Sequence, residues 1–72
     1  MLTTEQLTQF FIDVADYHTF YDSVKMRAGQ AMYNVLNTTY PEIAKQINGS
    51  ETLDPYYNDN NIPNFLAFLI GQ

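Results

Sequence analysis

Cysteine is absent from this chain, basic residues are scarce, and no long apolar run occurs. Without cysteine, neither a disulfide nor a thiolate-bound metal can stabilise the fold. The 72 residues must therefore rely on packing, on oligomerisation or on a partner. A domain of this size buries only about 60% of the surface that its unfolded chain exposes. The lack of cysteine is also consistent with a reducing compartment.

The shortness of the apolar runs argues against a membrane protein. The longest run is residues 65–70, whereas a helix that spans a bilayer needs roughly 20 residues. The amino terminus has no basic flank followed by an apolar segment, so we expect no signal peptide. These features predict a soluble, cytoplasmic protein that makes no membrane contact.

The scarcity of basic residues argues against direct nucleic-acid binding. Eight acidic residues oppose Lys25, Arg27 and Lys45, which gives a net charge of −5. Binding to a phosphate backbone requires a stripe of Lys and Arg, and three scattered cations cannot form one. Imitation of DNA by the acidic residues is a weak hypothesis, because these residues are spread singly. A hydrated acidic surface is the interpretation that the pattern favours.

The first predicted helix covers about residues 4–16. Thr3 can cap it while Gln6 reaches back to the Thr3 N–H, and Leu2 can pack on Leu7 as a hydrophobic staple. An apolar stripe at helical spacing then predicts the core face. It consists of Leu7, Phe10, Phe11, Val14 and Ala15.

The second predicted helix covers about residues 20–37, with Thr19 or Asp22 as its cap. Gly29 inside it costs about 1 kcal/mol relative to alanine. It indicates either a close approach of another backbone or drift at an exposed position. The expected core face consists of Phe20, Tyr21, Val24, Ala28, Ala31, Met32, Val35 and Leu36.

A polar row at helical spacing follows the other side of this helix: Ser23, Arg27, Gln30 and Asn34. Such rows are usually solvated. The guanidinium of Arg27 also suits a carboxylate, so it can pair with Asp54 or Asp59 and dock the segment that carries them. Contact with a partner protein is the alternative.

Two shorter helices complete the prediction, at about residues 41–47 and 62–70. The chain is therefore expected to be all-α, a small bundle of three to four short helices in a single domain over residues 1–72. The last helix is apolar nearly all round, so it must be buried centrally or against another chain. We favour an edge position, with Phe65 or Phe68 facing outward beside Tyr56 and Tyr57.

The segment DPYYNDNNIP, residues 54–63, is rich in groups that often bind ligands. A calcium loop that starts at Asp54 would need glycine at its sixth position and glutamate at its twelfth, and the chain has Asp59 and Phe65 there. His18, the single imidazole, is distant in sequence. The residue types favour turns instead. Tyr56 and Tyr57 then serve as half-buried lids over the core or as anchors for a partner.

No catalytic function is expected. Ser23, His18 and Asp22 offer the residue types of a triad, but three common residues close in sequence do not establish its geometry. We therefore expect neither enzymatic activity nor a metal or other cofactor.

Two stretches resemble a group of small tailed-bacteriophage proteins: FYDSVKMRAGQAMYNVL and INGSETLDPYYNDNNIPNFLAFL. The resemblance covers about residues 20–69 and rests on a YD-x-V-K-x-R-x-GQA pattern followed by DPYY. The matching positions are Tyr21, Asp22, Arg27, Gly29, Gln30, Asp54, Pro55, Tyr56 and Tyr57. Small phage proteins commonly act in the host cytoplasm by binding and redirecting an enzyme.

The resemblance therefore implies a protein that inhibits or redirects a host or phage enzyme complex, such as RNA polymerase, a nuclease or a defence complex. An oligomeric accessory protein without an inhibitory role is the alternative, and a DNA mimic is the weaker one. The residues expected to contact a partner are Arg27, Gln30, Asn34, Tyr56, Tyr57, Phe65 and Phe68.

Overall fold

The computed structural model describes residues 2–71, which form four α-helices and two short 3-10 turns with no strand. The all-α class predicted from the sequence is therefore confirmed. The α-helices are α1 (Thr4–Phe20), α2 (Ala28–Thr39), α3 (Pro41–Ile47) and α4 (Ile62–Gly71). The 3-10 turns are η1 (Asp22–Val24) and η2 (Asp59–Asn61). Within residues 2–71, no helix is both long enough and apolar enough to cross a bilayer.

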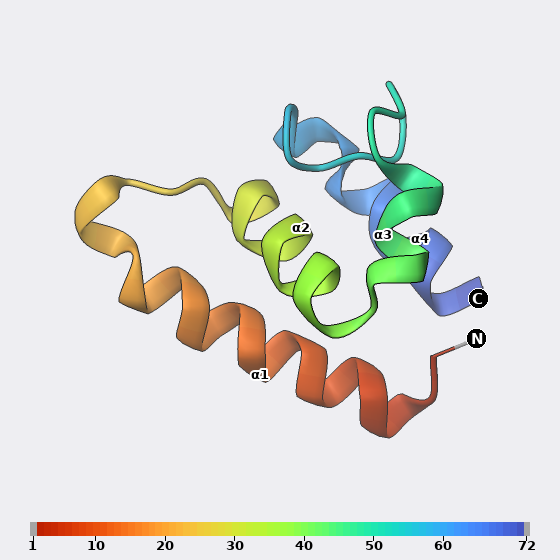
Figure 1. Ribbon diagram of the computed structural model, residues 1–72, viewed down its shortest axis with the longest axis horizontal. Coiled ribbons are helices and arrows are strands. Elements are labelled where there is room, and N and C mark those ends of the chain that lie inside the picture. The colour runs from red at the N-terminus through yellow and green to blue at the C-terminus, as the bar shows by residue number, and fades with distance from the viewer. Residues whose placement is uncertain (1, 72) are drawn as a thin grey trace.

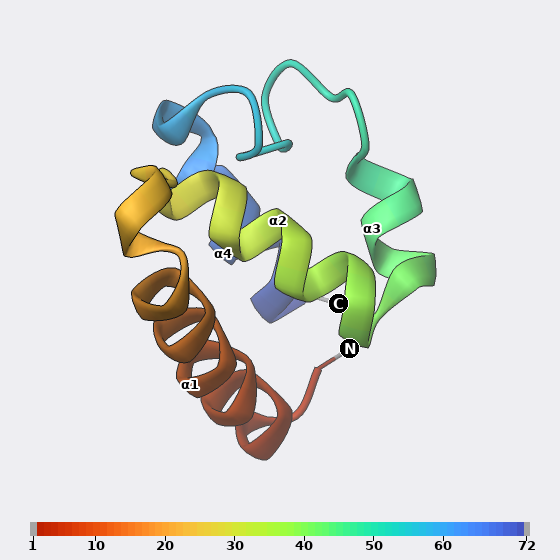
Figure 2. The same ribbon diagram turned by 60° about the vertical axis from the view of Figure 1, so that its left-hand side comes forward.

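Helix α2 lies at the centre of the arrangement. It packs against α1 on one side and against α3 on the other (Figures 1 and 2), and α4 contacts η2, the turn that precedes it. The connection from α3 to α4, residues 48–61, folds back toward the first turn of α2. The segment that carries most of the polar sequence signals is therefore held against the central helix.

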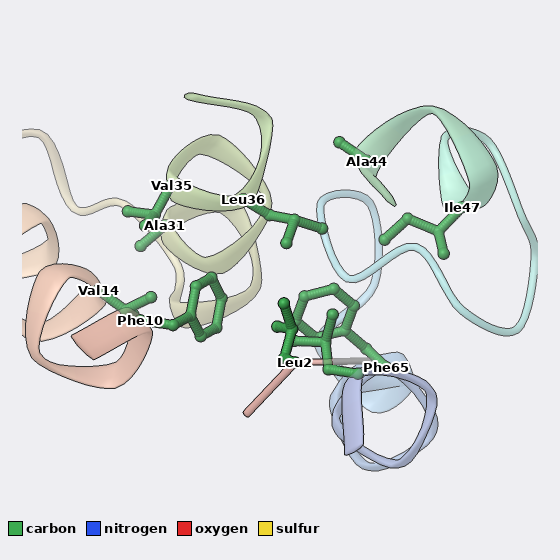
Figure 3. Close-up of a cluster of buried hydrophobic side chains, with 10 residues drawn as sticks. Leu2, Phe10, Val14, Ala31, Val35, Leu36, Ala44, Ile47 and Phe65 are labelled. Carbon is green, nitrogen blue, oxygen red and sulfur yellow. The ribbon is translucent and has the colours of Figure 1, made fainter. Parts of the chain in front are cut away.

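The core lies where the four helices meet (Figure 3). Phe10 of α1 and Phe65 of α4 contact each other across it, with ring centroids 6.3 Å apart. Both rings are fully buried or nearly so, and burying such a side chain stabilises a fold by about 1.5–3 kcal/mol. The buried apolar residues are Leu2, Phe10, Val14, Ala31, Val35, Leu36, Ala44, Ile47, Phe65 and Leu69.

Helix α1 begins where the sequence predicted. The Thr3 Oγ1 accepts the Gln6 N–H at 3.1 Å, and the Gln6 Oε1 accepts the Thr3 N–H at 2.8 Å. Its core face is narrower than expected, because Phe11 and Ala15 are exposed. The helix packs mainly against one neighbour, α2, so a single narrow stripe suffices.

The predicted boundary between the first two helices is wrong. Helix α1 continues to Phe20, because Tyr17 extends the apolar stripe and packs against the core, and this burial outweighs the weak helix propensity of the segment. The chain then turns through η1, and Lys25 adopts the left-handed region with φ of 56°. Neither Thr19 nor Asp22 caps α2, which begins at Ala28. Phe20 and Val24, expected in the core, are 77% and 64% exposed.

Helix α4 also differs from the arrangement that the sequence favoured. Phe65 and Leu69 are fully buried, and Phe68 packs partly buried against the core. A large apolar side chain that does face outward on α4 is Ile70, which is 61% exposed. The central alternative is thus closer to the structure, because the Phe10 ring takes Phe65 as its partner.

Gly29 is buried, and the residue 54–61 segment passes directly over it. A Cβ at this position would overlap the Pro55 carbonyl oxygen and lie 2.5 Å from the Asp59 Oδ1. Of the two interpretations of this glycine, the close approach of another backbone is therefore correct.

We expect Gly29→Ala to destabilise the protein by about 2–3 kcal/mol, although alanine is the better helix former. The added methyl meets the Pro55 backbone carbonyl, which cannot move without shifting the segment. Urea unfolding followed by circular dichroism measures the loss. Gly71→Ala is the matched control, because no atom lies within 4 Å of a Cβ built there. Equal stability of the two variants would contradict this account.

Candidate functional site

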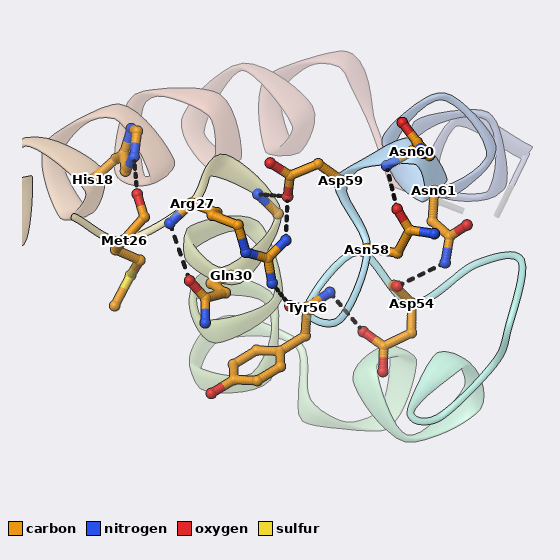
Figure 4. Close-up of polar contacts among 11 residues, drawn as sticks. His18, Met26, Arg27, Gln30, Asp54, Tyr56, Asn58, Asp59, Asn60 and Asn61 are labelled. Carbon is orange, nitrogen blue, oxygen red and sulfur yellow. Dashed lines mark hydrogen bonds and ion pairs between the residues drawn. The ribbon is translucent and has the colours of Figure 1, made fainter.

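Arg27, which precedes α2, makes polar contacts with a distant part of the chain (Figure 4). Its Nη1 donates to the Asp59 Oδ1 at 2.8 Å, and its Nη2 donates to the Tyr56 carbonyl. The same Asp59 oxygen accepts the Gly29 N–H at 3.1 Å. We call this set, Arg27, Gly29, Tyr56 and Asp59, the Arg27 junction. It ties the start of α2 to the segment that leads into α4.

Asp59 acts in the Arg27 junction as a helix cap supplied from a distant part of the chain. The first N–H groups of a helix lack partners within the helix and favour a negative charge. Asp59 satisfies one of them at Gly29, and the Gln30 Oε1 satisfies the Arg27 N–H at 3.0 Å. The sequence allowed Arg27 to pair with Asp54 or with Asp59, and Asp59 is the partner.

The segment that supplies Asp59 is held by Asp54, whose side chain is almost completely buried. Its carboxylate accepts the Gly49 N–H at 2.8 Å and the Tyr56 N–H at 2.9 Å. Asn61 closes the segment from the other end, because its Nδ2 donates to the carbonyls of Asp54 and Glu51. The loop therefore has a defined shape, and the carboxylates of Asp54 and Asp59 are engaged by protein donors.

Three tyrosines form a row beside the Arg27 junction: Tyr33 on α2, then Tyr56 and Tyr57. The ring centroids of Tyr33 and Tyr56 are 5.8 Å apart, and those of Tyr56 and Tyr57 are 5.0 Å apart, both edge to face. Tyr33 and Tyr56 are partly buried, whereas Tyr57 is 73% exposed. The tyrosine row therefore runs from the core edge out to solvent.

Burial raises the pKa of the Tyr33 phenol, and the nearby charges of Asp54 and Tyr57 raise this pKa further. An ordinary tyrosine loses its proton only near pH 10. Tyr33 therefore stays neutral throughout the physiological range and keeps a hydroxyl that can donate or accept a hydrogen bond.

The remaining residues expected to contact a partner have structural roles. Gln30 accepts the Arg27 N–H and so caps the start of α2, and Asn34 donates from its Nδ2 to the Tyr17 hydroxyl at 3.2 Å and so links α2 to α1. Phe65 is fully buried, and Phe68 is partly buried against the core. Of the predicted set, Arg27, Tyr56 and Tyr57 are brought together, and Tyr57 presents most surface to solvent.

Sequence reasoning missed two members of this region. Tyr33 was not recognised as part of the tyrosine row, because its partner Tyr56 lies 23 positions later (56 − 33) and no local spacing reveals the pair. The Asn61 amide, which donates to two loop carbonyls, was also missed. Its signal was the unusual density of asparagine near Asp54, a composition suited to bonding loop carbonyls.

The residue types of a catalytic triad do not combine in the structure as they would in a hydrolase. The His18 Nε2 donates to the Met26 carbonyl and closes the turn between α1 and α2 (Figure 4). Ser23 and Asp22 lie exposed on η1. Among residues 2–71, no three His, Cys, Asp or Glu side chains gather closely enough to hold a metal ion.

Comparisons of the chain with protein-family models, with curated proteins and with solved structures gave no match.

We expect Asp59→Ala to lower the free energy of unfolding by about 2 kcal/mol and Arg27→Ala by about 1 kcal/mol. The Arg27–Asp59 pair is 40% and 44% exposed, so solvent screens it. Asp59→Ala costs more because it also leaves the Gly29 N–H without its cap. Urea unfolding measures both losses.

The control for these variants is Lys45→Ala, because Lys45 and Glu42 form a pair that is 74% and 82% exposed. We expect no measurable change from it. Equal losses for Arg27→Ala and Asp59→Ala, or wild-type stability of Arg27→Ala, would contradict the double role of Asp59.

Proposed function

We propose that this chain is a small phage-type protein that binds a host or phage enzyme complex during infection and inhibits or redirects it. The observation that carries the binding role is the exposure of Tyr57 on a segment whose backbone is held in place. The inhibitory role and the setting follow from the resemblance of the sequence to small phage proteins.

A held segment favours binding because little conformational entropy is lost when a partner contacts it. The backbone next to Tyr57 is fixed on one side by the Tyr56 N–H bond to Asp54 and on the other by the Arg27–Asp59 pair. The Tyr57 ring also packs edge to face against Tyr56.

Tyrosine and arginine are the residue types that contribute most often to the strongest contacts in protein interfaces. Here Tyr57 is largely exposed. The Arg27 side chain is 40% exposed, and it donates a hydrogen bond to the Tyr56 carbonyl. The proposed contact surface is therefore the tyrosine row together with Arg27.

We expect immobilised protein to retain an enzyme subunit from bacterial lysate, and we expect Tyr57→Ala to reduce the retained amount at least about tenfold. Quantitative mass spectrometry compares the variants. Phe20→Ala is the matched control, because Phe20 is another highly exposed aromatic side chain and lies outside the tyrosine row. Circular dichroism checks that each variant is folded. Retention of the same subunit in equal amounts by Tyr57→Ala would refute the proposed surface.

An oligomeric accessory protein is the second candidate, favoured by the outer face of α1. Phe11 and Ile12 are 44% and 49% exposed there, beside the exposed small side chain of Ala15. An uncovered apolar helix face of this kind suits a second copy of the chain.

The two candidates differ in solution mass. For the enzyme-binding protein, we expect light scattering to give the monomer mass of 8.3 kDa across micromolar concentrations. A mass that rises with concentration and returns to the monomer value in Ile12→Ser would support the oligomeric accessory protein instead.

A further inference from the structure

A pocket of about 280 Å³ opens between α1 and α2, and no residue of the tyrosine row is among those that line it. It is lined by Asp13, Tyr17, Val35, Thr38 and Thr39. We propose that this pocket receives an arginine side chain from the partner protein, with its guanidinium held by the Asp13 carboxylate. The inference rests on the proposed function, because it names a chemical feature of the partner.

The lining matches the two parts of an arginine side chain. Val35 and the Tyr17 ring offer apolar surface for the methylene groups, and aromatic faces also attract guanidinium ions. The hydroxyls of Thr38 and Thr39 and the carboxylate of Asp13 provide acceptors for the five N–H groups. A guanidinium is planar and weakly hydrated, so it suits such a mixed pocket better than an ammonium group.

Asp13 has capacity for this contact. Its Oδ1 accepts one hydrogen bond from the Gln9 Nε2 at 2.9 Å, and the side chain is partly buried. Within residues 2–71, Asp13 forms no ion pair, because the two ion pairs of this part of the chain join Arg27 to Asp59 and Lys45 to Glu42. A partner cation would therefore be its first counter-charge.

The end of α2 adds a second source of negative potential. Thr38 and Thr39 belong to its last turn, where the backbone carbonyls carry the negative end of the helix dipole. That turn contains no basic side chain of its own to compensate this charge. The net charge of −5 further favours the approach of a basic group.

The test titrates isotopically labelled protein with N-acetyl-arginine-N-methylamide and follows the methyl resonances of Val35, Thr38 and Thr39 by NMR. We expect saturable shifts with a dissociation constant on the order of millimolar, as befits a single side chain. The uncharged citrulline analogue should produce no saturable shift. The lysine analogue should bind more weakly than the arginine analogue.

Asp13→Asn should weaken binding of the arginine probe about fivefold or more, because it removes the charge-assisted contact. Asp16→Asn is the matched control: it changes the net charge equally from an exposed position on the same helix, and it should retain binding. No saturable shift with wild type, equal shifts with citrulline, binding of lysine as tight as that of arginine, or unaltered binding by Asp13→Asn would each overturn the proposal.

These outcomes are separable from the proposed function. Partner capture that depends on Tyr57 would stand even if the arginine probe failed to bind. Conversely, the protein could bind the arginine probe and capture no enzyme subunit. That result would support the pocket as an arginine-binding site and would refute the proposed function.

Discussion

The carboxylate of Asp59 is the group on which the arrangement of this small protein depends. One of its oxygens accepts both the Arg27 guanidinium and the Gly29 N–H, so a single side chain neutralises a cation and caps the central helix. Each contact is modest, since the pair is partly exposed. These contacts matter mainly for the arrangement of the elements, because they set where α2 begins and keep the loop against it. The absence of a side chain at Gly29 allows the loop backbone to come this close.

Polar contacts within the loop add to the stability that the small apolar core provides. With few large buried side chains, the chain orders its longest irregular segment through polar contacts made inside the segment itself. Asp54 binds two backbone N–H groups, and Asn61 binds two backbone carbonyls, so each buried polar group is matched by a complementary one. A segment ordered in this way can display Tyr57 without burying it.

What the sequence could predict depends on how far apart the interacting residues lie. The cap of α1 was predicted correctly because Thr3 and Gln6 are three positions apart and their side chains are sufficient to form it. The start of α2 was not predicted correctly, because it depends on Asp59. In addition, the turn-forming residues that precede α2 can equally well continue α1. Gly29 signalled a close approach without identifying the approaching segment. The tyrosine row could be predicted only in part. Tyr56 and Tyr57 are adjacent in the sequence, but the contact with Tyr33 is not evident from it.

The cap on α2 has a consequence for how the chain acquires its structure during synthesis. Asp59 lies 30 positions after the N–H that it binds. During synthesis, the residues of α1 and α2 are therefore joined before the group that defines the first turn of α2 is added to the chain. In that interval residues 21–27 have only local bonds, such as that from His18 to Met26, to fix their path. The boundary between the first two helices is therefore settled late, by the carboxy-terminal part of the chain folding back onto the amino-terminal part.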